Sequence, residues 1–170
     1  LGDEKETDHL LVRLAIVARY KGELERSARL ASEALERARA GDNRRDEAMA
    51  LDNLAMVAFE QGDLELGLDL VHDSASVAES IGFSWWRGVA LLSAAEWLIR
   101  RGDPKAARRE LREGLSALAA VPDLVNLPIA LATGAAIAAA EGDAMRAGTL
   151  WGAVEAAGDR EPRPTTAGTL

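Results

Sequence analysis

The residues RGDP at positions 101–104 mark the point at which this sequence repeats itself. The same pattern recurs as KGEL at 21–24, QGDL at 61–64 and EGDA at 141–144, so that the glycines are 40 residues apart. Other columns agree at this offset: Leu11, Leu51, Leu91 and Leu131, then Ala15, Ala55, Ala95 and Ala135. Similarity at a fixed period is typical of repeat architectures. The sequence therefore predicts four repeats of 40 residues.

Each repeat is predicted to hold two helices joined at this glycine. Apolar residues in the segment before it recur at the helical period, as Leu51, Leu54 and Ala55 do. Glycine can take the left-handed conformation that ends a helix, and the residue after it can cap the next helix. That residue is Asp63, Asp103 or Asp143 in three of the repeats. RGDP is thus interpreted as a helix stop and a helix start, not as an adhesion motif.

The expected fold is all-α: eight antiparallel helices stacked as a right-handed superhelix. Their predicted ranges are 8–20, 24–39, 46–60, 64–80, 85–100, 104–119, 124–140 and 144–157. Residues 1–157 would form the repeat domain and 158–170 a flexible tail. Gly2 occupies the same column as Gly82, so the first residues are expected to form a turn from a preceding repeat.

The composition excludes several classes of function. The 170 residues include no cysteine and two histidines, which argues against thiol chemistry, disulfides and nitrogen-rich metal sites. No apolar run approaches the roughly 18 residues of a membrane span, and no signal segment follows Leu1. We expect no metal, no membrane contact and a cytoplasmic location.

The column pattern resembles the tetratricopeptide repeat. A large apolar residue is followed by a small residue four positions later and by glycine seven further on, as in Leu51, Ala55 and Gly62. The period of 40 residues exceeds the usual roughly 34 and would suit HEAT-like repeats better, but the glycine–acidic turn favours the tetratricopeptide family. The resemblance covers residues 4–157 and implies a surface that binds proteins.

Three stretches are also similar to the repeat region of large bacterial regulators. They are ALERARAGDN at 34–43, the segment 85–119 and EGDAMRAGTLWGAVEAAG at 141–158, of which TLWGAVEAAG is the most specific. LuxR-type, MalT-like regulators join such repeats to a nucleotide-binding ATPase module. The resemblance implies a protein-interaction or effector-sensing module of a transcriptional regulator. The sequence has no phosphate-binding loop motif, so we expect no cofactor here and ATP only in a separate upstream domain.

Two other classes of function were weighed against this one. The first is a free-standing scaffold with the same fold, which the coding sequence flanking residues 1 and 170 would distinguish. The second is an enzyme that uses Asp52, Glu60 or Glu96 for acid–base catalysis. All three belong to predicted first helices, whose polar faces must carry some charged residues. We therefore expect no catalytic residue.

The charges are unevenly distributed along the chain. No lysine or arginine occurs between Asp46 and Trp86, whereas the next repeat carries a basic group: Arg100, Arg101, Lys105, Arg108, Arg109 and Arg112. A basic patch can bind nucleic acid, but this one has no interleaved aromatic residues. We expect neighbouring helices to pair across the stack and no direct contact with nucleic acid.

The tetratricopeptide resemblance places the partner-binding surface on the first helices, which line the concave face of such arrays. The residues it selects are His9, Val12, Ile16, Arg19, Met49, Asp52, Met56, Phe59, Leu92, Glu96 and Ile99. None of the columns that bind a peptide's terminal carboxylate in chaperone-binding members is basic here. The expected partner is a protein or peptide, such as an amphipathic helix or another domain of the same full-length protein. The residues would alternatively pack the inner wall of a tight superhelix.

The tryptophans and the last repeat complete the predictions. Trp97 and Trp151 share columns with aliphatic residues and are interpreted as core. Trp85 and Trp86 are adjacent on a helix and cannot both face one core. One of them is therefore a candidate ligand contact or a buried anchor. The segment 124–140 has no charged residue. Repeat arrays usually end in a polar cap. We expect the tail, a further repeat or a second copy of the chain to cover this apolar surface.

Overall fold

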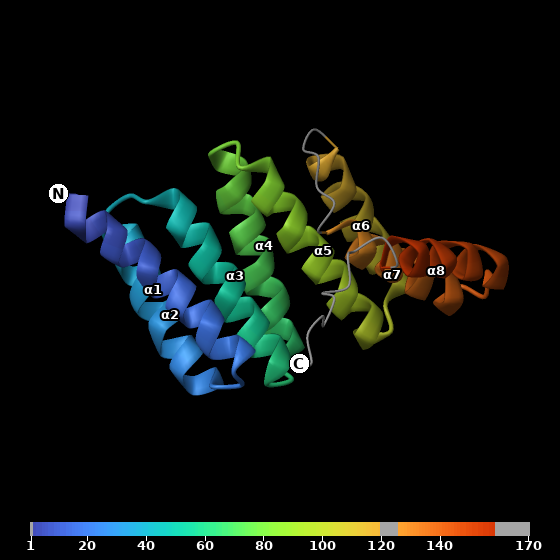
Figure 1. Ribbon diagram of the computed structural model, residues 1–170, viewed down its shortest axis with the longest axis horizontal. Helices are drawn as coiled ribbons and strands as arrows, with labels where there is room; N and C mark the ends of the chain where they lie inside the picture. The colour runs from blue at the N-terminus through green and yellow to red at the C-terminus, as the bar shows by residue number, and fades with distance from the viewer. Residues whose placement is uncertain (1, 120–125, 159–170) are drawn as a thin grey trace, which may run out of the picture.

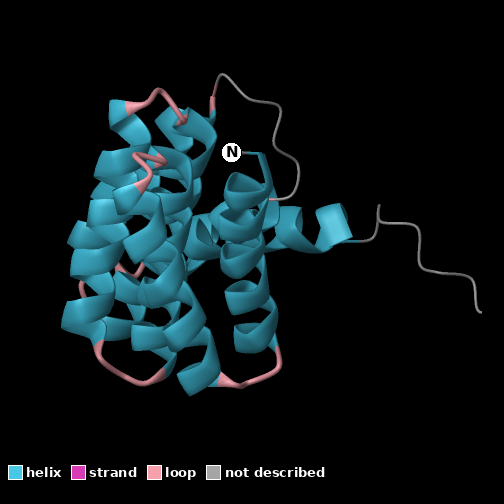
Figure 2. Ribbon diagram, turned by 90° about the vertical axis from the view of Figure 1, so that its left-hand side faces the viewer, coloured by secondary structure: helices cyan, strands magenta, loops and turns pink. Residues whose placement is uncertain are grey.

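The computed structural model describes residues 2–119 and 126–158, and within those ranges the regular structure is entirely helical (Figure 2). The helices are α1 (Gly2–Tyr20), α2 (Leu24–Ala40), α3 (Arg44–Glu60), α4 (Leu64–Ser80), α5 (Ser84–Arg101), α6 (Pro104–Leu118), α7 (Leu127–Ala140) and α8 (Ala144–Gly158). The predicted all-α fold of helix–turn–helix repeats is confirmed. No helix in the described ranges combines the length and the apolar character needed to cross a membrane.

The turn inside each repeat is built as the sequence predicts. Gly22, Gly62, Gly102 and Gly142 have φ between 76° and 86°, which is the left-handed region that glycine tolerates. The Asp103 carboxylate accepts a hydrogen bond from the Ala106 N–H at 2.9 Å and so caps α6. Asp63 and Asp143 cap α4 and α8 in the same way. The turns between repeats are similar, with Gly82 at φ 68° and Asp42 at φ 50°.

Small residues let the paired helices approach closely. A Cβ atom built at Gly67 on α4 would lie 2.3 Å from the ring of Phe59 on α3. The equivalent position in the first repeat is Ser27, whose buried hydroxyl donates a hydrogen bond to the Ala15 carbonyl at 2.8 Å. These small residues let the second helix of a repeat lie close to the first.

The stack is curved, and the first helix of each repeat lies on its inner side. Each helix packs against its neighbours in sequence, and the successive first helices α1, α3, α5 and α7 also touch one another. The backbones of successive second helices do not approach each other in this way among the described residues, although the side chains of His72 on α4 and Glu110 on α6 meet. The first helices therefore form the concave face. Figure 1 shows three pairs side by side and the last pair, α7 and α8, lying crosswise to them.

Two ends differ from the predicted ranges. Helix α1 already begins at Gly2. The equivalent glycine, Gly82, lies in the turn that ends α4, but the described residues contain no helix before α1 that Gly2 could end. Helix α7 begins at Leu127. The predicted start of that helix at Leu124, like the predicted loose tail, falls outside the described residues.

Candidate partner-binding groove

A cavity of about 360 Å³ opens on the concave face and is lined from all four first helices and the residue before α7; we call it the central pocket. Six of the eleven predicted concave-face residues line it: Ile16, Arg19, Asp52, Met56, Leu92 and Glu96. Trp85 and Trp86 line it as well. Ile16 and Ile129, which are 113 positions apart in the sequence, thus meet in one space.

A second recess continues the central pocket toward the end of the array. This α5–α7 recess has a volume of about 350 Å³ and is lined by Glu96, Ile99, Arg100, Ile129, Ala132, Thr133 and Ala136. Glu96 and Ile129 line both spaces. The two form one groove, whose surface is mostly apolar, and it contains the predicted residue Ile99.

The prediction that Val12 and Phe59 line the partner-binding surface is wrong, because the structure buries both in the core. Val12 is fully buried and packs with Ala34 and Ala50. Phe59 is 2% exposed and packs against α4 and the indole of Trp97. Both side chains point between repeats, where the neighbouring helix covers them, and not into the open groove.

His9 and Met49 lie near the groove but line neither of its cavities. The His9 ring nitrogen Nδ1 is 3.0 Å from a carboxylate oxygen of the buried Asp46, a contact that links α1 to α3. Met49 is partly buried between two core clusters. These two predicted residues connect helices and are not placed in the central pocket or the α5–α7 recess.

The carboxyl group of Asp52 is the least satisfied group in the central pocket. Its Oδ1 atom is closed off from solvent and has no hydrogen-bond partner among the described residues. Burial raises the pKa of Asp52 to about 6, and the charge of Arg19 opposes part of this rise. A carboxylate oxygen that is buried without a partner is unfavourable, so this position costs the folded state free energy.

Arg19 does not pair with Asp52, because a polar network holds its guanidinium elsewhere. Its Nη1 is 2.7 Å from the Glu60 carboxylate, and its Nε donates to the Asn53 side chain at 3.3 Å. Asn53 in turn donates to the buried Ser27 hydroxyl at 2.9 Å. The network ties α1, α2 and α3 together at the wall of the pocket.

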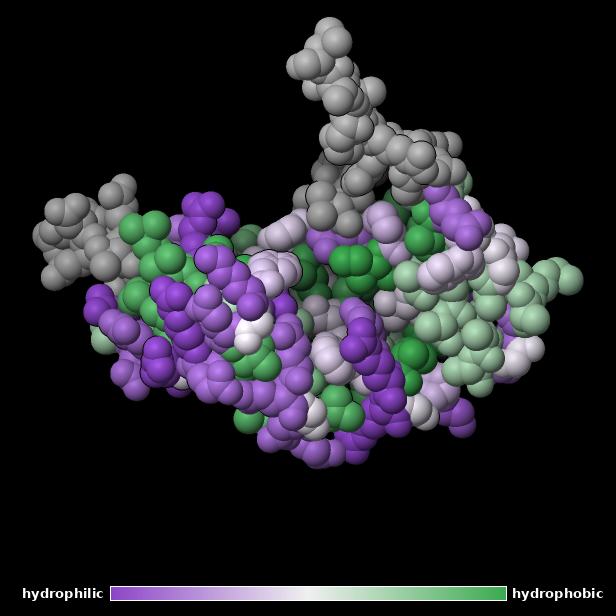
Figure 3. All heavy atoms as spheres, turned by 60° about the horizontal axis from the view of Figure 1, so that its bottom comes forward, coloured by the Kyte–Doolittle hydropathy of each residue, from purple (hydrophilic) through white to green (hydrophobic). Residues whose placement is uncertain are grey.

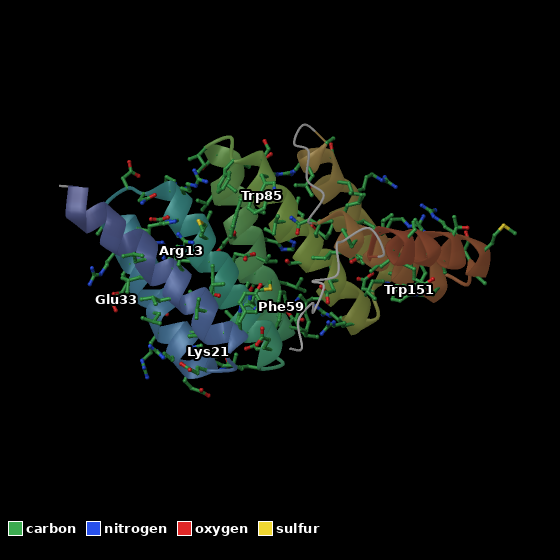
Figure 4. All side chains as sticks on the ribbon, in the orientation of Figure 1. Arg13, Lys21, Glu33, Phe59, Trp85 and Trp151 are labelled. Carbon is green, nitrogen blue, oxygen red and sulfur yellow. The ribbon has the colours of Figure 1, made fainter. Side chains whose placement is uncertain are left out.

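The adjacent tryptophans divide their roles as their spacing predicts. Trp86 is buried, and its indole N–H donates to the Ser74 hydroxyl at 3.2 Å. Trp85, labelled in Figure 4, is partly buried, packs beside Phe83 and also lines the central pocket. Trp86 is therefore the buried anchor, and Trp85 is the more accessible of the two at the groove.

The prediction that Trp151 is a core residue is also wrong, because its side chain is 52% exposed. In the earlier repeats its column is covered by the helix that follows, but α8 has no following helix in the described residues. Trp151 lines a shallow apolar recess of about 390 Å³ with alanines of α7 and with Gly148. Figure 3 shows this alanine-rich end in pale green.

The opposite end of the array, formed by α1, also exposes large apolar side chains. Leu10, Leu14 and Val17 of α1 are all about half exposed. One repeat later the counterpart of Leu10 is Ala50, which is buried against Val12 and Ala34 of the preceding repeat, and the counterpart of Val17 is Val57, which is also buried. Both end faces therefore expose residues of the columns that pack one repeat against the next.

Charges pair across the stack only in part. Arg101 reaches Glu65 of the preceding helix pair at 2.7 Å, and Arg108 pairs with Glu141. Arg100 instead pairs within its own helix, with Glu96 at 2.6 Å. Among the described residues, Lys105, Arg109 and Arg112 form no ion pair and are exposed on α6. The described histidine, aspartate and glutamate side chains include no group that could hold a metal ion.

Several lining residues were missed by the sequence analysis: Tyr20, Asn53, Val89, Ser93, Arg100, Asn126 and Thr133. One signal could have found three of them. The column of Arg13, Asn53, Ser93 and Thr133 is polar in every repeat, inside helices that are otherwise largely apolar. A polar column inside such helices indicates the wall of the groove, although Asn53 and Thr133 are themselves buried.

Comparison with known proteins shows the fold alone. The structure is similar to the crystal structure of BtubC (BKLC) from P. vanneervenii, with a TM-score of 0.78 and 14% sequence identity. The match covers 98% of this chain and 70% of that one. No protein-family model matches the sequence, and no curated protein is significantly similar to it.

Proposed function

We propose that this chain is a non-enzymatic protein-interaction module whose concave groove binds a segment of a partner protein. The observation that carries the proposal is the continuity of the central pocket with the α5–α7 recess. Together they offer a long, mostly apolar surface on one face of the array. An amphipathic helix laid in such a groove buries its apolar side, which is a common mode of peptide recognition.

The charges of the groove narrow the chemistry of the segment. Asp52 and Glu96 are the acidic side chains that line it. Its two arginines are already paired, Arg19 with Glu60 and Arg100 with Glu96. The fitting segment is therefore apolar with basic residues. A terminal carboxylate is not the expected anchor, since the groove offers no unpaired cation to hold it.

The biological setting that we propose is a cytoplasmic bacterial transcriptional regulator. Support comes from the resemblance of TLWGAVEAAG, and of the stretches 34–43 and 85–119, to the repeat region of LuxR-type, MalT-like regulators. In that setting the bound segment is another domain of the same protein or an effector protein, and ATP belongs to a separate domain. The alternative is a free-standing scaffold with the same groove and partners unrelated to transcription.

Selection of random 16-residue peptides on the purified chain, followed by titration of the enriched peptides, tests the binding function. The variant Ile129→Lys places a cation in the groove, at a side chain that is 45% exposed and lines both spaces. The matched control is Leu66→Lys on α4, where the side chain is 48% exposed and lies outside the groove. We expect at least tenfold weaker peptide binding in Ile129→Lys and unchanged binding in Leu66→Lys.

Equal affinity of both variants for the enriched peptides would remove the groove from consideration. Peptides enriched in acidic residues would contradict the proposed chemistry. Circular dichroism and urea unfolding of each variant establish that the fold is intact. Both substitutions are at exposed positions, so neither is expected to change stability by more than about 0.5 kcal/mol.

A further inference from the structure

We propose that the central pocket is a subsite for one basic side chain, the ammonium or guanidinium group of a lysine or arginine on the bound segment. The assignment rests on the proposed function and makes it more specific. It places the cation beside Asp52 and the aliphatic stem of the side chain along the apolar wall. The rest of the segment would continue along the α5–α7 recess.

The carboxyl group of Asp52 supplies the first reason. It lies in a cavity, one of its oxygens is closed off from solvent, and no side chain of the described residues donates a hydrogen bond to that oxygen. Among the described residues that line the pocket, Arg19 is the one cation, and it is bonded to Glu60 and Asn53. Asp52 as a whole is only partly buried and lines the pocket, so an incoming cation would lie beside its carboxylate and offset the charge that is unfavourable in the unbound protein.

The rest of the lining supplies the second reason. Glu96 adds a carboxylate from α5, which is paired with Arg100, and Trp85 adds an aromatic side chain. Met56 and Leu92 line the pocket between these groups. Lysine and arginine carry a long apolar stem with a charge at its end, and aromatic rings attract such cations. An anion would be repelled by the Asp52 carboxylate, and an aliphatic side chain would leave the charge of Asp52 without a counterion from the ligand.

The raised pKa of Asp52 agrees with this assignment. A position where burial raises a carboxyl pKa to about 6 is unfavourable for folding at neutral pH. Groups with such shifts concentrate at functional sites. The charged and titratable groups that line the pocket around Asp52 are Arg19 and Tyr20 of α1 and Glu96 of α5. Binding that depends on ionised Asp52 should weaken as pH falls through about 6.

Single blocked amino acids test the subsite without a partner protein. The probes are the acetylated amides of lysine, arginine and norleucine, the last having the same four-carbon stem as lysine and no charge. Binding is followed by the indole N–H signals of Trp85 and Trp86 in heteronuclear NMR spectra. We expect saturable shifts with the two basic amides and at least tenfold weaker binding of the norleucine amide.

Two variants decide which carboxylate is responsible. Asp52→Asn keeps the shape and removes the charge, and we expect it to weaken binding of the lysine amide at least tenfold. Asp69→Asn removes the same charge from an exposed position on α4 and should leave binding unchanged. Equal binding by Asp52→Asn and the unmodified chain would overturn the assignment. So would a loss of binding only near pH 4, the ordinary range of a carboxyl group.

Spermidine is the probe for a free amine. Binding of spermidine ten times tighter than that of the blocked lysine would overturn the assignment to a protein side chain, in favour of a small-molecule site. The amide titrations need no selected peptide. A failure of peptide selection and a failure of this subsite are therefore separate results.

Discussion

The ring of Phe59 on α3 stacks on the indole of Trp97 on α5, with the ring centroids 4.4 Å apart and the ring planes 16° from parallel. Figure 4 shows Phe59 in the interior between these helices. On the other side of the phenyl ring, Gly67 of α4 leaves it just enough room. The contact joins the second repeat to the third directly behind the groove. It shows that groove and core share neighbouring positions of the same helices.

The first prediction is that Phe59→Ala affects stability and not recognition. Removing a buried phenyl ring leaves a cavity, and we expect the free energy of unfolding to fall by about 3–5 kcal/mol. Met56 lies one turn earlier and is partly exposed in the groove, so Met56→Ala should lower the free energy of unfolding by clearly less. Urea unfolding of both variants measures the difference. A loss for Met56→Ala as large as that for Phe59→Ala would contradict the burial pattern.

The second prediction concerns Gly67. Gly67→Ala places a methyl group against the Phe59 ring, which the packed core cannot easily move, and should destabilise the protein by about 1–3 kcal/mol. Gly148→Ala in α8 is the control, because no atom lies within 4 Å of the added methyl group. Alanine is the better helix former, so this variant should gain up to about 1 kcal/mol. A gain in stability from both variants would show that α3 and α4 pack less closely around Gly67 than the structure indicates.

The third prediction is a pH-dependent gain in stability from Asp52→Asn. The pKa of Asp52 is raised from 3.8 to about 6 in the folded protein, so the folded state holds its proton more tightly. Stability from this group therefore falls as pH rises from about 4 to 6. At pH 7 the variant should be more stable by about 1–3 kcal/mol, and at pH 4 by almost nothing. Urea titrations at both pH values measure this, and a loss of stability at pH 7 would contradict it.

The fourth prediction concerns His72 and Glu110, which join α4 to α6 with Nε2 and Oε1 3.4 Å apart. The hydrogen bond to Glu110 raises the pKa of His72, and the charges of Glu110, Asp69 and Asp73 add to the rise, while partial burial opposes it. The stabilising contact is fully present below about pH 6.5 and is lost as pH rises through the folded-state pKa. Glu110→Gln should therefore cost more stability at pH 5.5 than at pH 8. An equal cost at both pH values would exclude a charged pair.

The fifth prediction is that the exposed α7–α8 end causes self-association through Trp151. We expect the chain to form a concentration-dependent oligomer in sedimentation experiments and Trp151→Gln to weaken it. Leu115→Gln on α6, at a side chain that is 42% exposed, serves as the control. The uncovered columns on α1 are the natural contact for this end, so Leu14→Gln should act like Trp151→Gln. A chain that stays monomeric at high concentration would remove the prediction.

The repeat and its turns were determined by the sequence itself. Gly102 needs no distant partner to take its left-handed conformation, and Asp103 caps a helix three residues away. The helical period of Leu51, Leu54 and Ala55 is equally local. Features that depend on a few neighbouring residues can be predicted from those residues. For this reason most predicted helix ends agree with the structure within two residues.

Only the tertiary structure decided which of these helical positions are open. Val12 and Ile16 are one turn apart on α1, yet Val12 is in the core and Ile16 lines the central pocket. Trp151 has a core column but no helix over it, and Asp52 has an ordinary polar position but an unusual pKa. Each outcome depends on how closely the next repeat approaches and how the stack curves. Both the approach of the next repeat and the curvature of the stack are set by many contacts between residues far apart in the chain. A local sequence pattern does not contain that information.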